Sequence, residues 1–324
     1  PYYNQRAALL ITISAYDEAT KLLTETQNLI NANPLIDEIE QAKTYDNLGW
    51  IEHEYTNYEA AIELFSKSLM IKESYTGVDR LAELGYTYNK LGRSYFEHNK
   101  KDNAVENYEK CRRCWVEYYG QNHPVTSEIY CNLGTLYMIN NKHIECAQYY
   151  NKFLAINKMA FGDEHPNIAH AYFALGYYYK HSGKPHEAKS HYNTAMEIEE
   201  KCNGKVSLRN AKIYMNLALL HIQEKAYATA LKYYISAIRI TQTLYKAQAL
   251  KMSCQGNCIY NLGYIFALNH DRKNQYESLI RCKMIYTKSE KSSLNTIEAA
   301  SVLKNVEKFN MTVDRYLNKE DQFI

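Results

Sequence analysis

Two cysteines are the first residues whose types and spacing could do chemistry. Cys111 and Cys114 are separated by two residues, a spacing used by thiols that bind zinc or exchange a disulfide. A structural zinc ion needs four ligands, and no second pair of cysteines or histidines stands at a matching distance. A redox motif of this kind is expected after a strand, whereas the pattern around it is helical. The pair therefore predicts packing residues.

Two further motifs have the right residue types but the wrong spacing or context. His186 and His191 are five residues apart, whereas the zinc-binding HExxH motif places its imidazoles four apart on one helical face. Gly183-Lys184 is followed by Pro185, where a phosphate-binding loop needs Ser or Thr. These motifs predict neither an enzyme nor a metal site, and we expect no cofactor.

A different chemistry is offered by an asparagine that returns along the chain, at Asn47, Asn132, Asn216 and Asn261. Asparagine is unfavourable inside a helix because its amide competes with the backbone, so its recurrence needs an explanation. A side-chain amide donates and accepts, and it can pair with the N–H and C=O of an extended peptide of any sequence. We therefore hypothesise a ladder of amides that holds a peptide. The alternative is that each asparagine bonds to a neighbouring part of the chain.

Each of these asparagines precedes a leucine, and this leucine marks a repeat. The leucines stand 43, 42, 42, 42 and 45 residues apart, at Leu48, Leu91, Leu133, Leu175, Leu217 and Leu262, and all but Leu217 are followed by Gly. In the first five units a small residue and then an aromatic one follow, as Ala188 and Tyr192 do. Extended backwards, the rule reaches Ala19 and Leu23. The period predicts a stack of similar units, the first of them degenerate.

Within each unit the spacing of apolar residues predicts two helices. In the third unit, apolar or small residues recur with helical periodicity over 130–137 and again over 146–153, and the polar residues 140–142 have turn composition. Each unit is therefore expected to form an αα-hairpin. The recurring glycine would cost about 1 kcal/mol relative to Ala in an ordinary helix, which indicates a close approach of neighbouring elements.

These units resemble the tetratricopeptide repeat over nearly the whole chain. The fourth unit matches that pattern throughout, at Tyr172, Leu175, Gly176, Tyr179, Ala188, Tyr192 and Ala195. The long period and the Gly-x-x-His-Pro connections at 120–124 and 162–166 resemble the kinesin light chain type. The resemblance implies an all-α superhelix, a solenoid of six to seven repeats. We predict a degenerate repeat over 1–41, six repeats over 42–287, and a linker with a capping helix over 288–324.

Composition excludes several other classes. The 38 Lys and Arg residues nearly balance 36 Asp and Glu, which argues against nucleic-acid binding. No apolar run approaches the length of a transmembrane helix, so we expect no membrane insertion. The 8 cysteines are typical of reduced packing residues in a cytoplasmic protein. The 32 tyrosines are interpreted chiefly as packing residues, with an aromatic binding surface as the alternative.

The resemblance implies that the first helices of the repeats line a concave groove. The residues expected to bind a peptide there are Asn47, Trp50, Asn89, Lys90, Arg93, Asn132, Phe173, Tyr177, Lys212, Asn216, Asn261 and Tyr264. We expect a non-catalytic scaffold or adaptor that holds an extended peptide of a partner protein. The alternatives are a structural subunit of a large cytoskeletal assembly, ciliary or axonemal, and a regulatory receptor that senses a peptide or effector.

Overall fold

The computed structural model describes residues 2–13, 15–32 and 38–244, which contain twelve α-helices and no strand. The chain divides into two compact units, Pro1–Asp163 (unit 1) and Glu164–Ile324 (unit 2), each of which is described by itself. The predicted sixth repeat, with Asn261 and Tyr264, lies outside the described residues, as does the predicted capping helix.

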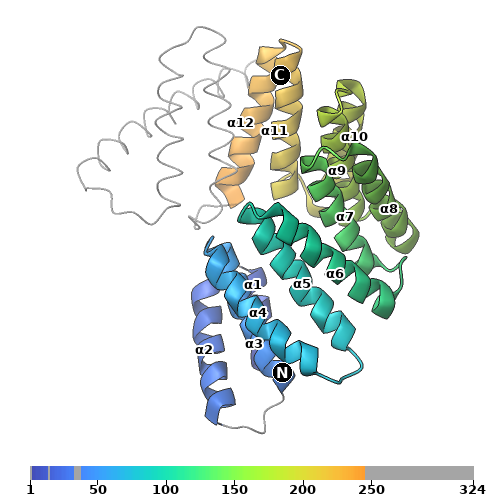
Figure 1. Cartoon of the computed structure of the whole chain (residues 1–324). Coiled ribbons are helices and arrows are strands. Elements are labelled where there is room, and N and C mark those ends of the chain that lie inside the picture. The colour runs from blue at the N-terminus through green and yellow to red at the C-terminus, as the bar shows by residue number, and fades with distance from the viewer. Residues whose placement is uncertain (1, 14, 33–37, 245–324) are drawn as a thin grey trace, which may run out of the picture. The chain divides into compact units, whose positions relative to one another are not determined.

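The helices pair into hairpins in chain order, and Figure 1 labels them. Unit 1 contains α1 (Tyr2–Thr12), α2 (Tyr16–Ala32), α3 (Glu38–Glu54), α4 (Tyr58–Ser74), α5 (Arg80–Glu97), α6 (Lys101–Tyr119), α7 (Pro124–Ile139) and α8 (His143–Phe161). The described part of unit 2 contains α9 (Pro166–His181), α10 (Pro185–Asn203), α11 (Leu208–Gln223) and α12 (Tyr227–Leu244). We call the first helix of each hairpin its A helix and the second its B helix. The predicted all-α fold of repeated hairpins is confirmed.

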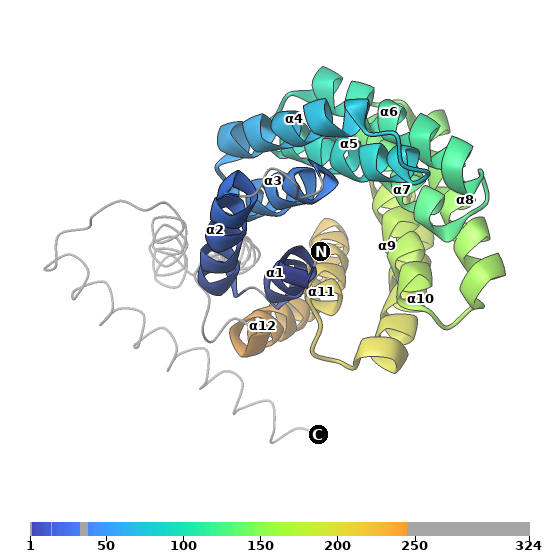
Figure 2. The same cartoon turned by 90° about the horizontal axis from the view of Figure 1, so that it is seen from below.

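In unit 1 the two kinds of helix form two layers. Figure 2 shows the A helices α3, α5 and α7 on the inner side of the unit and the B helices α4, α6 and α8 on its outer side. The first hairpin is α1 with α2, and it contains Ala19 and Leu23, both fully buried. The degenerate unit expected from these two residues therefore exists as a hairpin, whose A helix also packs on α3.

Each glycine of the Leu-Gly motif within residues 38–244 lies against the aromatic ring of its own B helix. A Cβ atom added to Gly134 would lie 2.7 Å from the ring of Tyr150, and one added to Gly92 would lie 2.4 Å from the ring of Tyr108. Gly49 with Phe65 and Gly176 with Tyr192 repeat this arrangement. The predicted close approach is thus between a helix backbone and a ring, and the small residue four positions before the ring is not the partner.

The two Gly-x-x-His-Pro connections end one helix and start the next. Gly120 and Gly162 follow α6 and α8 with φ of 93° and 76°, a region that favours glycine. Proline then begins α7 and α9, where a missing N–H costs nothing. The histidine is the N-cap: Nδ1 of His123 accepts a hydrogen bond from the backbone N–H of Val125 at 3.2 Å. His165 does the same at the start of α9.

Many of the tyrosines belong to stacks of three rings between an A and a B helix. In α7 and α8 the ring of Tyr149 stacks on Tyr130 at 5.8 Å and on Tyr137 at 5.3 Å. The same three-ring stack returns in the next hairpin as Tyr172, His191 and Tyr179. In the hairpin after it, the ring of Tyr233 stacks on His221 and is tilted against Tyr214. The interpretation of tyrosine as a packing residue therefore holds at these positions.

In the five hairpins from α3 to α12, the open end away from the turn contains a large or polar buried residue that differs from repeat to repeat. These residues lie near the end of successive B helices and are at most 2 % exposed: Lys72, Trp115, Asn157, Glu199 and Thr241. Each comes thirty residues after a small residue of its own A helix, such as Gly85 before Trp115. The indole of Trp115 lies so close to Gly85 that a Cβ there would approach it to 2.3 Å.

Candidate functional site

All the predicted site residues that the structure describes lie on A helices. In unit 1 they are Asn47 and Trp50 on α3, Asn89, Lys90 and Arg93 on α5, and Asn132 on α7. In unit 2 they are Phe173 and Tyr177 on α9 and Lys212 and Asn216 on α11. We call these two groups the A-helix face of unit 1 and the A-helix face of unit 2.

Polar side chains connect neighbouring A helices across the face of unit 1. The amide nitrogen of Asn132 donates to Oδ1 of Asn89 at 2.9 Å. The amide nitrogen of Asn47 donates to the backbone oxygen of Asn4 at 3.2 Å and approaches its Oδ1 at 3.5 Å. In each case the donor is the residue before the motif leucine. The acceptor lies 43 residues earlier in the chain, on the preceding A helix. Asparagines in this face therefore do bond to neighbouring repeats.

These bonds leave part of the Asn89–Asn132 pair available. Asn132 uses one amide hydrogen, and Asn89 uses its oxygen. Among the described residues, no group bonds to the carbonyl oxygen of Asn132 or to the amide hydrogens of Asn89. Both side chains are half-buried. The pair therefore presents an acceptor and a donor together, which are the two groups that a peptide bond requires.

An aromatic and cationic cluster lies near the C-terminal ends of α3 and α5. The guanidinium of Arg93 lies 4.9 Å from the ring centre of Trp50, which stacks on His53 at 4.6 Å. His53 Nδ1 is 2.9 Å from the hydroxyl of Ser94, and burial together with the charge of Arg93 lowers the pKa of His53 to about 4. His53 is consequently neutral near pH 7. Arg93 is exposed, so its charge and the half-buried indole are both accessible.

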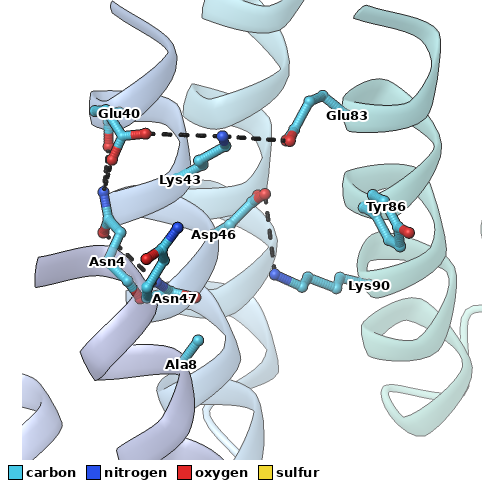
Figure 3. A pocket seen from close by; sticks show the side chains of 10 residues that line it. Asn4, Ala8, Glu40, Lys43, Asp46, Asn47, Glu83, Tyr86 and Lys90 are labelled. Carbon is cyan, nitrogen blue, oxygen red and sulfur yellow. Dashed lines mark hydrogen bonds and ion pairs between the residues drawn. The ribbon is translucent and has the colours of Figure 1, made fainter. Parts of the chain in front are cut away.

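A hollow of about 280 Å³ opens between α1, α3 and α5 (Figure 3). Its charged lining contains both signs: the acidic Glu40, Asp46 and Glu83 and the basic Lys43 and Lys90. Lys43 Nζ lies between Glu40 and Glu83, at 3.7 and 3.5 Å, and Lys90 Nζ lies 3.9 Å from Asp46. Because positive and negative groups are interleaved, the hollow provides polar contacts without a strong field of one sign.

Beneath this hollow lies a buried ion network that the sequence analysis missed. Lys72 Nζ contacts carboxylate oxygens of Asp46 and Glu83, both at 2.8 Å, and donates to the hydroxyl of Thr87 at 3.0 Å. Burial alone would raise the pKa of Asp46, but Lys90 and Lys72 lower it below its usual value. Asp46 therefore stays ionised. The available signal was the position of Lys72, thirty residues after Ala42, because α6, α8, α10 and α12 have a buried residue at the equivalent position.

The A-helix face of unit 2 is organised around Lys180, which is not one of the residues predicted to bind a peptide. Its ammonium donates to Oδ1 of Asn216 at 2.6 Å and lies 4.9 Å from the ring centre of Tyr177. The amide nitrogen of Asn216 donates to the backbone oxygen of Lys212 at 2.9 Å. Phe173 packs on Tyr192, with ring centres 5.7 Å apart. On the A-helix face of unit 2, Asn216 therefore positions the side chain of Lys180.

The cysteine pair, the histidine pair and the Gly-Lys motif of the sequence analysis lie at positions that serve packing or turns. Cys111 and Cys114 lie within α6, and burial raises the pKa of both thiols. His191 stacks between tyrosines, and Gly183 lies in the turn between α9 and α10. Among residues 2–13, 15–32 and 38–244, no group of three or more His, Cys, Asp or Glu side chains could hold a metal ion. No helix in these ranges is both long and apolar enough to cross a membrane.

Repeated hairpins with an aromatic ring against each motif glycine define a helical repeat protein built from two-helix units. Sequence profiles of the tetratricopeptide repeat match residues 84–125, 129–201 and 211–243. These three stretches of the chain are therefore tetratricopeptide repeats. No curated protein matches the chain in sequence.

Several solved structures share the fold. BtubC (BKLC) from P. vanneervenii is 22% identical with a TM-score of 0.58, and the match covers 74% of this chain and 94% of that one. A Podosopora anserina putative kinesin light chain with TPR-like repeats is 18% identical with a TM-score of 0.50, covering 65% and 100%. A Rap protein complexed with Competence and Sporulation Factor is 14% identical with a TM-score of 0.60, covering 98% of both chains. At these identities the likeness extends to the fold alone.

Proposed function

We propose that the protein is a non-catalytic interaction scaffold that binds an extended peptide of a partner protein on the A-helix face of unit 1. The observation that carries the proposal is the Asn89–Asn132 pair, whose remaining acceptor and donor lie on adjacent A helices. A peptide laid across α5 and α7 would give its N–H to Asn132 and its C=O to Asn89. Each such hydrogen bond contributes a net stabilisation of about 1 kcal/mol.

The surroundings of the pair supply side-chain selectivity. Trp50 offers an aromatic surface, and the exposed Arg93 offers a planar guanidinium suited to carboxylates. The hollow between α1, α3 and α5 provides room for a polar side chain of the ligand. Backbone pairing would then give general affinity, and these groups would select the sequence.

A regulatory receptor is the second candidate. The fold likeness to a Rap protein that was solved with Competence and Sporulation Factor favours it. A receptor would use the same face but would change conformation on binding, so a change in the solution scattering profile on adding ligand distinguishes the two. The cytoskeletal or ciliary role remains a prediction from sequence.

The test is a calorimetric titration of the full chain with peptides selected from a random display library. We expect the double variant Asn89→Ala/Asn132→Ala to bind a selected peptide about thirtyfold more weakly, since about 2 kcal/mol is lost with the two bonds. The matched control is Asn103→Ala/Asn151→Ala, which removes two exposed asparagines of B helices in the same unit. Equal affinities of the two double variants would refute the amide pair as the binding element.

A further inference from the structure

The A helices of unit 2 have an unusual charge composition. Neither α9 nor α11 contains an Asp or Glu in its 16 residues. Their cationic residues include Lys180, Arg209 and Lys212, and the two helices contact each other. The described acidic side chains of unit 2 lie instead on α10 and in the connections. The A-helix face of unit 2 is therefore positive and lacks acidic residues of its own.

Two of the three cations have no carboxylate partner within the described residues. Arg209 is neutralised by Glu199, whose Oε2 lies 2.6 Å away. Lys180 meets a neutral amide and the face of Tyr177, and burial lowers the pKa of Lys180 to about 8. Lys212 is exposed and stands one turn before Asn216 on α11. An ammonium that is partly removed from water without a counter-ion is costly, so Lys180 favours an arriving anion.

Unit 1 shows that this arrangement is not general in the chain. There Lys43 lies within 4 Å of Glu40 and Glu83, Lys90 lies 3.9 Å from Asp46, and Lys72 contacts two carboxylates. Each of these lysines has a carboxylate from its own unit. The corresponding counter-ions are lacking on α9 and α11 because the two helices have no acidic residue.

We propose that the A-helix face of unit 2 binds an acidic segment of a peptide partner, with a partner carboxylate pairing with Lys180. The inference rests on the proposed function and names the chemistry of the partner. Tyr177 beneath the ammonium and Phe173 one turn earlier give an aromatic surface beside the charge, and Lys212 extends the positive strip along α11. A carboxylate that accepts from Lys180 in this partly water-excluded place forms a charge-assisted hydrogen bond.

The experiment uses the full chain and a display library of random peptides. We expect selected peptides to be enriched in Asp and Glu. A selected peptide, synthesised with blocked ends, is titrated by calorimetry together with its Glu→Gln or Asp→Asn version. Lys180→Gln should weaken binding of the acidic peptide about tenfold, and Lys180→Arg should retain most of it, because charge is preserved. The control is Lys201→Gln, which removes the same charge from an exposed site on α10.

The outcomes separate this inference from the proposed function. Peptides that bind without acidic enrichment overturn the inference and leave the scaffold proposal standing. Equal weakening by Lys180→Gln and Lys201→Gln also overturns it, because the attraction would then be to net charge. Failure to select any peptide overturns both proposals. Circular dichroism of the Lys180→Gln variant checks that α9 and α11 remain folded.

Discussion

The two ends of each hairpin differ in how strictly the repeat is kept. Near the turn, a backbone without a side chain meets an aromatic ring in one hairpin after another, as Gly92 meets Tyr108 and Gly134 meets Tyr150. At the open end the buried residue is a lysine in α4, an indole in α6 and an amide in α8. The contacts at the uniform end recur from hairpin to hairpin, whereas those at the variable end are particular to each hairpin.

The contacts at the open end explain this individuality. Lys72 joins Asp46 of its own hairpin to Glu83 of the next one, so it fits only a following helix with an acid at that point. Trp115 instead donates its indole N–H to the backbone oxygen of Ala82 at 3.4 Å. Exchanging hairpins within unit 1 would therefore leave a buried charge or a cavity. The contacts near the turns are alike in these hairpins, but the contacts at the open ends make the order of the hairpins specific.

The largest expected effect comes from emptying the open end of the α5–α6 hairpin. Trp115→Ala removes a fully buried indole that fills the space above Gly85, and the cavity should destabilise the fold by about 4 kcal/mol. Urea unfolding followed by circular dichroism measures the loss. Met70→Ala, which truncates a side chain that is 73% exposed, is the control. A loss below that of the control would show that the open end does not hold the hairpins together.

The next effect comes from removing the buried cation of the α3–α4 hairpin. Lys72→Met keeps the length of the side chain but leaves Asp46 and Glu83 without their shared partner, and we expect a loss of about 3 kcal/mol at neutral pH. The loss should shrink on adding Asp46→Asn, since one of the unpaired charges disappears. Urea unfolding of both variants measures the difference, and strict additivity of the two changes would contradict the network.

The smallest effect tests the uniform end. Gly134→Ala places a Cβ against the ring of Tyr150 and should cost about 1 to 2 kcal/mol through overpacking, although alanine is the better helix former. The chain supplies its own comparison, because the equivalent position in α11 is Ala218, fully buried in the same core cluster as Tyr234. Ala218→Gly should cost less than 1 kcal/mol. Stabilisation by Gly134→Ala in thermal unfolding would show that the ring has room.

The sequence allowed the repeated features of the fold to be predicted, but not the contacts that differ from hairpin to hairpin. The period of the Leu-Gly motif predicted the hairpins, and the positions of Ala19 and Leu23 predicted the first one, because burial on a helix imposes a spacing that a single sequence reveals. The position of Lys72 and Trp115 recurs from hairpin to hairpin, but the residue type at that position does not, since each side chain is suited to its own contacts. Their roles depend on which residues the fold brings together.

The same limit applies to the candidate site. Recurrence singled out Asn132 and Asn216 as residues of A helices, and the resemblance to the tetratricopeptide repeat implied that Lys212 lies on the same face. Recurrence could not show that Asn132 bonds to Asn89 or that Asn216 orients Lys180, because these partners are 43 and 36 residues away in the chain. The charge difference between the A helices of the two units was readable in the sequence. Its consequence appears only in the structure, where Lys180 has no carboxylate partner among the residues described.

The chain contains only two tryptophans, Trp50 and Trp115, and both belong to unit 1. Selective excitation of indole emission therefore reports on unit 1 alone, although tyrosines are spread over both units. Trp115 is sealed in the core, whereas Trp50 is half-buried beneath Arg93 on the A-helix face. A ligand that covers Trp50 should alter the emission, and one held by Lys180 alone should leave it unchanged. The protein thus contains a native optical reporter that tells its two faces apart.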